Sequence, residues 1–151
     1  MNFKLMTAVL ILAATPVLAD DEGGDAAEGE ENFRQCASCH AVTTPEGEVL
    51  AGRGTSGPNL YGIAGGTPGA VADFRYSDAM IAAGEAGLVF DEANFVAYLQ
   101  DPTAFIREFL GDSSARVKMT FKVRKEEDAM DFYAYLASLA PAAEAEAEAS
   151  Q

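Results

Sequence analysis

The sequence predicts an all-α domain in which about five short helices are joined by long loops. Apolar residues recur at helical spacing in the segments 92–100, 102–110 and 126–139. Glycine and proline, 14 and 6 in number, gather mainly between these segments. No stretch alternates apolar and polar residues as a half-buried strand would. We therefore expect a core that is built from helices alone.

Both ends of the chain are predicted to lie outside this domain. Lys4, the apolar run that follows it and the small residues up to Ala19 are typical of a secretory signal cleaved after Ala19. A retained membrane anchor is the alternative, but the run contains Pro16 and is short for a span of roughly 20 residues. The predicted organisation is a signal peptide (1–19), an acidic segment (20–27), the folded domain (28–140) and a disordered Ala/Glu tail (141–151).

The negative net charge of the chain excludes some classes of binding partner. The chain has 10 Lys and Arg against 24 Asp and Glu, a net charge of −14. Cleavage would remove Lys4 and make the balance more negative still. Such a chain is a poor ligand for nucleic acid or for anionic membranes. We expect a monomeric protein that is exported to the periplasm, with no nucleic-acid binding and no stable membrane insertion.

The first predicted helix runs from about 26 to 38. Asp25 followed by Glu28 resembles a capping box at its start. The segment 42–59 has no sustained hydrophobic periodicity and is predicted to be a loop. Ser77 is predicted to cap a short helix that Gly84 stops.

The later helices have clearer boundaries. Asp91 is placed to cap the helix at 92–100, and Asp101-Pro102 to start the next one, which Gly111 closes. Acidic residues fill the first turn of the last helix, 126–139, as the helix dipole favours. The buried face of the helix at 102–110 is predicted to consist of Phe105, Ile106, Phe109 and Leu110.

The segment Cys36-Ala37-Ser38-Cys39-His40 matches the attachment motif of a covalent c-type haem. Each thiol can add to one haem vinyl group, and the histidine can then reach the iron. A dithiol redox site of the thioredoxin type lies in a βαβ unit, and the sequence around Cys36 does not indicate a parallel strand. A structural zinc site usually needs four Cys or His ligands, and this chain has three. A disulfide between such close residues is possible but strained.

A second axial ligand is expected to be a methionine, because His40 is the only histidine. The three candidates after the signal are Met80, Met119 and Met130. Met130 lies inside a helix and Met80 in a short one, whereas Met119 lies in a loop far from His40 along the chain. We therefore predict His40 and Met119 as the iron ligands of one haem c per chain. A thioether ligand implies a raised reduction potential.

These motifs, in this order, resemble those of class I c-type cytochromes, and most of all the larger bacterial cytochrome c2 or c-550 type. The resemblance covers about 29–139 and implies the class I cytochrome c fold, with Gly29 and Phe33 crossing Phe132 and Tyr135 where the terminal helices pack. The residue roles that the resemblance implies are Pro58 accepting a hydrogen bond from His40, Tyr76 bonding a haem propionate, Tyr98 near the methionine sulfur, Met119 as axial ligand and Phe121 shielding the haem edge.

Two positions depart from the family pattern. An arginine and a tryptophan that serve a propionate in the family align with Gly66 and Phe90. Both donors are therefore missing, and Arg75 or a water is a candidate replacement.

The resemblance also implies a function. The chain is expected to be a periplasmic single-haem electron carrier, not an enzyme, between a quinol-oxidising cytochrome bc complex and a terminal oxidase or photosynthetic reaction centre. A dedicated electron-transfer subunit of a periplasmic dehydrogenase is the alternative, and a haem peroxidase or gas sensor is less favoured. The basic cluster expected to dock acidic redox partners is Arg116, Lys118, Lys122, Arg124 and Lys125.

Overall fold

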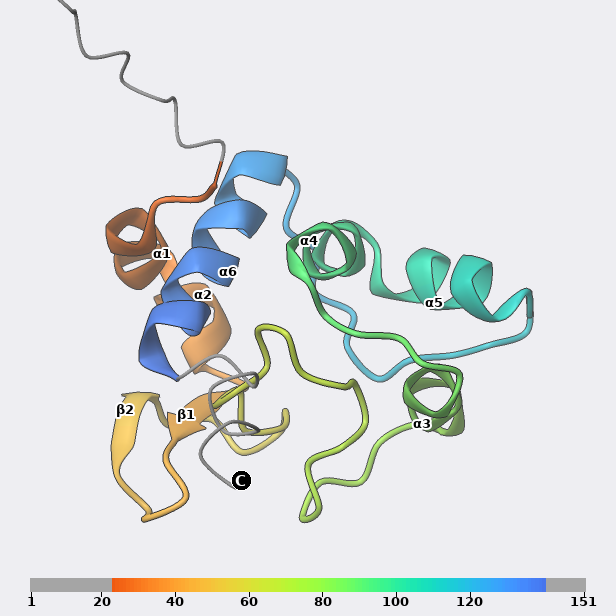
Figure 1. Cartoon of the computed structure of the whole chain (residues 1–151), viewed down its shortest axis with the longest axis horizontal. Helices are drawn as coiled ribbons and strands as arrows, with labels where there is room; N and C mark the ends of the chain where they lie inside the picture. The colour runs from red at the N-terminus through yellow and green to blue at the C-terminus, as the bar shows by residue number, and fades with distance from the viewer. Residues whose placement is uncertain (1–22, 141–151) are drawn as a thin grey trace, which may run out of the picture.

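The structure, a computed structural model, describes residues 23–140, which form six helices and one short antiparallel hairpin (Figure 1). The predicted helical class is confirmed, with the small sheet as an addition. The signal peptide, residues 20–22 and the tail lie outside the described residues. In chain order the elements are α1 (Ala26–Asn32), α2 (Arg34–Ala37), β1 (Ala41–Thr43), β2 (Val49–Gly52), α3 (Asp78–Glu85), α4 (Glu92–Gln100), α5 (Pro102–Leu110) and α6 (Glu126–Leu139).

The first predicted helix is divided at Phe33. The Asp25 side chain caps α1 by accepting hydrogen bonds from the backbone N–H groups of Ala27 and Glu28. At Phe33 the N–H bonds to the carbonyl of Glu30, three residues back, instead of four. This tighter turn separates α1 from α2, so the prediction of one unbroken helix over 26–38 was wrong.

The predicted loop at 42–59 contains the hairpin. Val42 pairs with Ala51 and Thr43 with Val49, and the register shifts between the two pairs. The irregularity, together with strands of three and four residues, explains why no alternating pattern is visible in the sequence. The Val42 side chain is completely buried, so it packs the hairpin against the core.

The terminal helices α1 and α6 pack against each other (Figure 1). A Cβ atom at Gly29 would lie 2.1 Å from the backbone oxygen of Asp131 and 2.8 Å from Cβ of Tyr135. Glycine is therefore required for this close approach. The ring centroids of Phe33 and Tyr135 are 5.4 Å apart, and Phe132 is buried. The predicted crossing of the terminal helices is confirmed.

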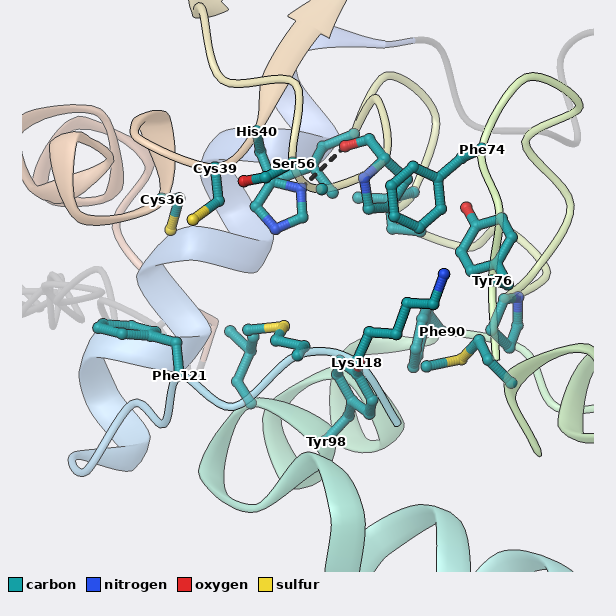
Figure 2. A pocket seen from close by; sticks show the side chains of 18 of the residues that line it. Cys36, Cys39, His40, Ser56, Phe74, Tyr76, Phe90, Tyr98, Lys118 and Phe121 are labelled. Carbon is teal, nitrogen blue, oxygen red and sulfur yellow. Dashed lines mark hydrogen bonds between the residues drawn. The ribbon is translucent and has the colours of Figure 1, made fainter. Parts of the chain in front are cut away.

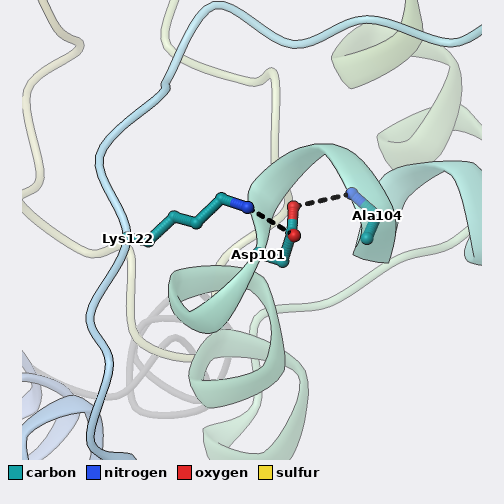
Figure 3. Close-up of polar contacts among 3 residues, drawn as sticks. All are labelled: Asp101, Ala104 and Lys122. Carbon is teal, nitrogen blue, oxygen red and sulfur yellow. Dashed lines mark hydrogen bonds and ion pairs between the residues drawn. The ribbon is translucent and has the colours of Figure 1, made fainter.

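Helices α3, α4 and α5 begin at the caps that the sequence indicates. The side chains of Ser77, Asp91 and Asp101 accept backbone hydrogen bonds at the three N-termini. Asp101 also pairs with Lys122, so one carboxylate joins α5 to the segment before α6 (Figure 3).

Two details of these helices differ from the prediction. Helix α3 continues through Gly84, where a Cβ would lie 2.2 Å from the backbone oxygen of Pro68; the glycine allows a loop to approach and does not end the helix. On α5, Ile106 is buried but Phe109 is 40% exposed, so Phe109 does not belong to the buried face.

The core gathers where α4 and α6 meet the loops. Phe90, Phe95 and Tyr98 form a chain of aromatic contacts with ring centroids 5.0 to 5.9 Å apart.

Over residues 23–140, none of the helices has the length and apolar character needed to cross a bilayer.

Candidate haem-binding site

The segment 36–40 forms the end of α2 and the turn that follows it. The backbone N–H groups of Cys39 and His40 both bond to the carbonyl of Cys36, at 3.0 and 2.9 Å. This turn keeps the three side chains on one side, where Figure 2 shows both thiols and the imidazole at the edge of a cavity.

The His40 ring is held by the loop at 57–58. Its Nδ1 lies 2.8 Å from the carbonyl oxygen of Pro58, which can only accept, so Nδ1 carries the proton (Figure 2). The other ring nitrogen, Nε2, is then left with a free lone pair. In Figure 2 this nitrogen points into the cavity.

Gly57 packs against the face of the imidazole. A Cβ atom there would lie 2.4 Å from Cε1 and 2.6 Å from Nδ1 of His40. The Gly57 N–H also bonds to the carbonyl of Cys39 at 2.7 Å. The sequence predicted a role for Pro58 but none for Gly57, although a glycine directly before the histidine-bonding proline is the signal that could have revealed it.

The cavity has a volume of about 370 Å³ and is lined mainly by apolar atoms. Segments far apart in the chain meet here, because α2, the loops at 56–77, α3, α4, the segment 118–121 and α6 all contribute. Every predicted site residue lines it. These are Cys36, Cys39, His40, Pro58, Tyr76, Tyr98, Met119 and Phe121.

Two of the three candidate methionines reach the cavity. Met119 and Met80 both line it, and Met80 is only 7% exposed. Met130 lies instead at a separate surface hollow beside the start of α6. The sequence placed Met80 in a short helix but gave no indication that this helix borders the site.

The two thiols have different surroundings in the free, unmodified chain. Burial and the neighbouring Cys39 raise the pKa of the Cys36 thiol to about 11. The hydroxyls of Ser56 and Ser38 hold the pKa of the exposed Cys39 thiol below its usual value. One sulfur therefore lies against the cavity wall and the other at its rim.

Of the two tyrosines that line the cavity, Tyr98 is buried and Tyr76 is half-buried. Burial raises the pKa of Tyr98, with Tyr76 contributing, and burial raises the pKa of Tyr76 less strongly. Tyr98 is 7% exposed and packs on Phe90 and Phe105. Both hydroxyls therefore remain neutral hydrogen-bonding groups at neutral pH.

The residues present fit a c-type haem. One thiol lies against the wall and the other at the rim, an imidazole nitrogen points into the cavity, the Met119 thioether lines it, and the walls are mainly apolar. The close fit of Gly57 against His40 shows a ring position that the fold itself imposes. Among residues 23–140, no group of three or more His, Cys, Asp and Glu side chains offers a competing metal site.

Comparison with known proteins gives the same picture. No family model matches the chain. It is 58% identical over 120 residues to the cytochrome c2 of Rhodovulum adriaticum, covering 79% of this chain and 95% of that one. It is 46% identical over 139 residues to the cytochrome c2 of Cereibacter sphaeroides, covering 91% and 94%. The solved structure of cytochrome c2 from Rhodobacter sphaeroides superposes with a TM-score of 0.75 at 47% identity, covering 77% and 96%.

A helical fold with crossed terminal helices, wrapped around a cavity that opens on a Cys-x-x-Cys-His turn, defines a class I c-type cytochrome. Haem attachment in this class is covalent, here one haem c through Cys36 and Cys39. Within the class, the chain belongs to the cytochrome c2 family.

Family membership settles the kind of activity. The chain is a single-haem electron carrier of the periplasm and not an enzyme. It works between a quinol-oxidising cytochrome bc complex and a photosynthetic reaction centre or terminal oxidase. Its partners are therefore redox proteins.

Proposed function

We propose that the chain carries one electron at a time on a haem whose iron His40 and Met119 would hold in both oxidation states. The support is the position of the His40 ring, whose Nδ1–H is engaged by Pro58 so that Nε2 is free towards the cavity that Met119 also lines. When bound, the haem supplies an iron that exchanges a single electron. Two protein ligands leave no position for a substrate, which suits a carrier and not a peroxidase or gas sensor.

The chain's own residues tune this site. The thioether of Met119 favours the reduced iron and raises the reduction potential. The Pro58 carbonyl holds the His40 ring in one tautomer and one orientation. Phe95 and Leu99 of α4 and Phe132 of α6 exclude water from the inner wall, so the surroundings need little reorganisation when the charge changes.

We assign supporting roles to three aromatic residues. Tyr98 is fixed by ring contacts to Phe90 and Phe105, and we place its hydroxyl near the Met119 sulfur. Tyr76 lines the same cavity and is the candidate donor to a haem propionate. Phe121 is 44% exposed and covers the haem edge from the Met119 segment.

The docking surface is the basic cluster, defined as Arg116, Lys118, Lys122, Arg124 and Lys125. Two of its members are paired with carboxylates, Lys122 with Asp101 at 2.6 Å and Lys125 with Asp128 at 3.9 Å. Arg116 donates hydrogen bonds to the backbone oxygens of Ser114 and Ala115. The cluster flanks Met119 and Phe121, and a redox partner with an acidic surface would be steered to the exposed edge.

The remaining assignments concern the ends and the assembly. We place signal cleavage after Ala19, the acidic segment at 20–27, the domain at 28–140 and a tail rich in Ala and Glu at 141–151. The carrier acts as a monomer, since it must release one partner before it meets the next.

The test is replacement of the sulfur ligand. Met119→Ala should lower the reduction potential sharply and abolish the weak far-red absorption band of the ferric protein, and carbon monoxide should then bind the ferrous form. Met80→Leu and Met130→Leu are matched controls that remove a thioether elsewhere, and both should retain the band. An unchanged potential and band in Met119→Ala, or their loss in Met80→Leu, would remove Met119 from its role.

A further inference from the structure

Phe90 lines the cavity without a side-chain hydrogen-bond donor, and Gly66, which is joined to it, does not line the cavity. The two residues are joined by their backbones, because the Phe90 N–H bonds to the Gly66 carbonyl at 2.9 Å. A Cβ at Gly66 would lie 2.5 Å from the carbonyl oxygen of Gly62, so a longer side chain cannot enter there. Phe90 is 4% exposed and packs on Phe95 and Tyr98. Neither position therefore supplies a side-chain donor to a haem propionate.

A haem nevertheless brings two propionate carboxylates, which need a counter-charge or donors wherever they are shielded from water. Among the described residues that line the cavity, Lys118 is the one lysine or arginine. Arg75, the replacement that the sequence suggested, is exposed and does not line the cavity.

The Lys118 side chain reaches across the mouth of the cavity. Its Nζ donates to the backbone oxygen of Arg75 and lies 5.7 Å from the centroid of the Phe74 ring. Figure 2 shows the side chain extending from the lower wall towards Phe74 and Tyr76. Phe74 in turn packs edge-on against Tyr76 at 4.8 Å. The ammonium and Tyr76 thus lie at the same end of the cavity.

We propose that Lys118 is a positioning residue that supplies the counter-charge to the haem propionates, in place of the donors missing at Gly66 and Phe90. An ammonium has three N–H donors, and the Arg75 carbonyl takes one, which leaves two for carboxylate oxygens. This inference rests on the proposed function, because it takes the propionates to lie at the Tyr76 end.

Lys118 therefore differs from the neighbouring cations of the basic cluster. Lys122 and Lys125 point to carboxylates of the protein surface, whereas Lys118 is held against the 74–76 segment beside the cavity. A cation at this place favours the reduced haem, which carries one positive charge fewer. Lys118 is exposed, but an ammonium in contact with a propionate lies within the Debye length, so its removal should lower the reduction potential by an effect that salt screens less than that of a more distant surface charge.

The experiment compares the haem-loaded wild type with Lys118→Gln, Lys118→Arg and the matched control Lys122→Gln, which removes the same charge four residues away. Reduction potentials are measured at low and high ionic strength, and redox-difference infrared spectra are recorded in the carboxylate region. We expect Lys118→Gln to lower the potential at both ionic strengths and to shift the carboxylate bands. Lys118→Arg should keep both properties close to the wild type, and the small effect of Lys122→Gln should disappear at high salt.

Equal shifts in Lys118→Gln and Lys122→Gln, or unchanged carboxylate bands in Lys118→Gln, would overturn the proposal. Loss of the far-red band in Lys118→Gln would also overturn it, since the lysine would then act on the Met119 segment. Failure of the proposed function would show separately, as a wild-type protein that lacks this band.

Discussion

The Nδ1–H group of His40 donates a hydrogen bond to the carbonyl oxygen of Pro58 across 2.8 Å. A histidine three residues after the end of α2 and a proline in a separate loop are thereby joined into one unit. The bond determines which imidazole nitrogen is left to face the cavity. Gly57 makes this arrangement possible, because it leaves room for the ring directly beside the proline.

The first prediction concerns this contact. Gly57→Ala places a methyl group 2.4 Å from Cε1 of His40, so the ring must move and its bond to Pro58 weakens. We expect a cost of about 1–3 kcal/mol in the free energy of unfolding, as for other overpacked sites, together with a changed far-red band. Denaturant unfolding and ferric-state absorption measure the two effects. Thr55→Ala, an exposed change in the same loop, is the control, and equal behaviour of the two variants would refute the prediction.

The second prediction tests the crossing of the terminal helices. Gly29→Ala would put a methyl group 2.1 Å from the Asp131 carbonyl oxygen, which forces α1 away from α6. We expect a loss of about 1–3 kcal/mol or more, and protein that accumulates poorly in the haem-loaded form. Thermal unfolding of the purified variant gives the magnitude. Glu31→Ala, on the exposed side of α1, should change stability by only a few tenths of a kcal/mol, and a comparable loss there would argue against a specific helix contact.

The third prediction concerns a polar contact between the same helices. The carboxylate of Asp131 is 8% exposed and accepts a hydrogen bond from the Asp25 N–H at 2.7 Å. Asp131→Ala leaves that N–H without its partner and should cost about 1–3 kcal/mol in unfolding free energy. Asp131→Asn keeps an acceptor oxygen and should lose less.

Amide hydrogen exchange provides a local readout for this contact. The Asp25 N–H should exchange faster in Asp131→Ala than in the wild type. Glu127→Ala, an exposed change in the first turn of α6, should leave that exchange rate unaltered. If both variants change it alike, the bond is not what protects this amide.

The fourth prediction is a pH dependence at the start of α5. The hydrogen bond from Lys122 and that from the Ala104 N–H hold the pKa of Asp101 below its usual value (Figure 3). Because the pKa is depressed in the folded state, the stabilisation is present above the unfolded pKa of about 4 and is lost as pH falls through the folded pKa. Asp101→Asn can still cap α5 but cannot pair with Lys122. The variant should therefore lose less stability on acidification below about pH 4.

Urea unfolding across the acidic range measures this difference. Lys122→Gln should reproduce the shallower acid dependence, and the double variant should add little to either single change. An unaltered acid dependence in Asp101→Asn would contradict a depressed pKa of Asp101, and an unaltered one in Lys122→Gln alone would remove the ion pair as its cause.

Much of the fold and site could be predicted from local patterns. The helix N-caps predicted at Ser77, Asp91 and Asp101 are confirmed. They could be predicted because an N-cap depends only on residues within one helical turn. The Cys-x-x-Cys-His spacing predicts covalent haem for the same reason. The hairpin and the break at Phe33 could not be predicted, since irregular pairing and a single tightened turn leave no periodic trace.

The sequence by itself determined that a haem is attached at 36–40 and that one histidine is available for its iron, because both follow from residue type and spacing. The tertiary structure decided which distant side chains share that haem's surroundings. Met80 and Met119 both line the cavity in the folded chain, whereas Met130 lies outside it. The Lys118 side chain forms a hydrogen bond to the 74–76 segment. These relationships join residues that lie about 40 positions apart in the chain, and only the packing of the helices and loops sets the distances between them.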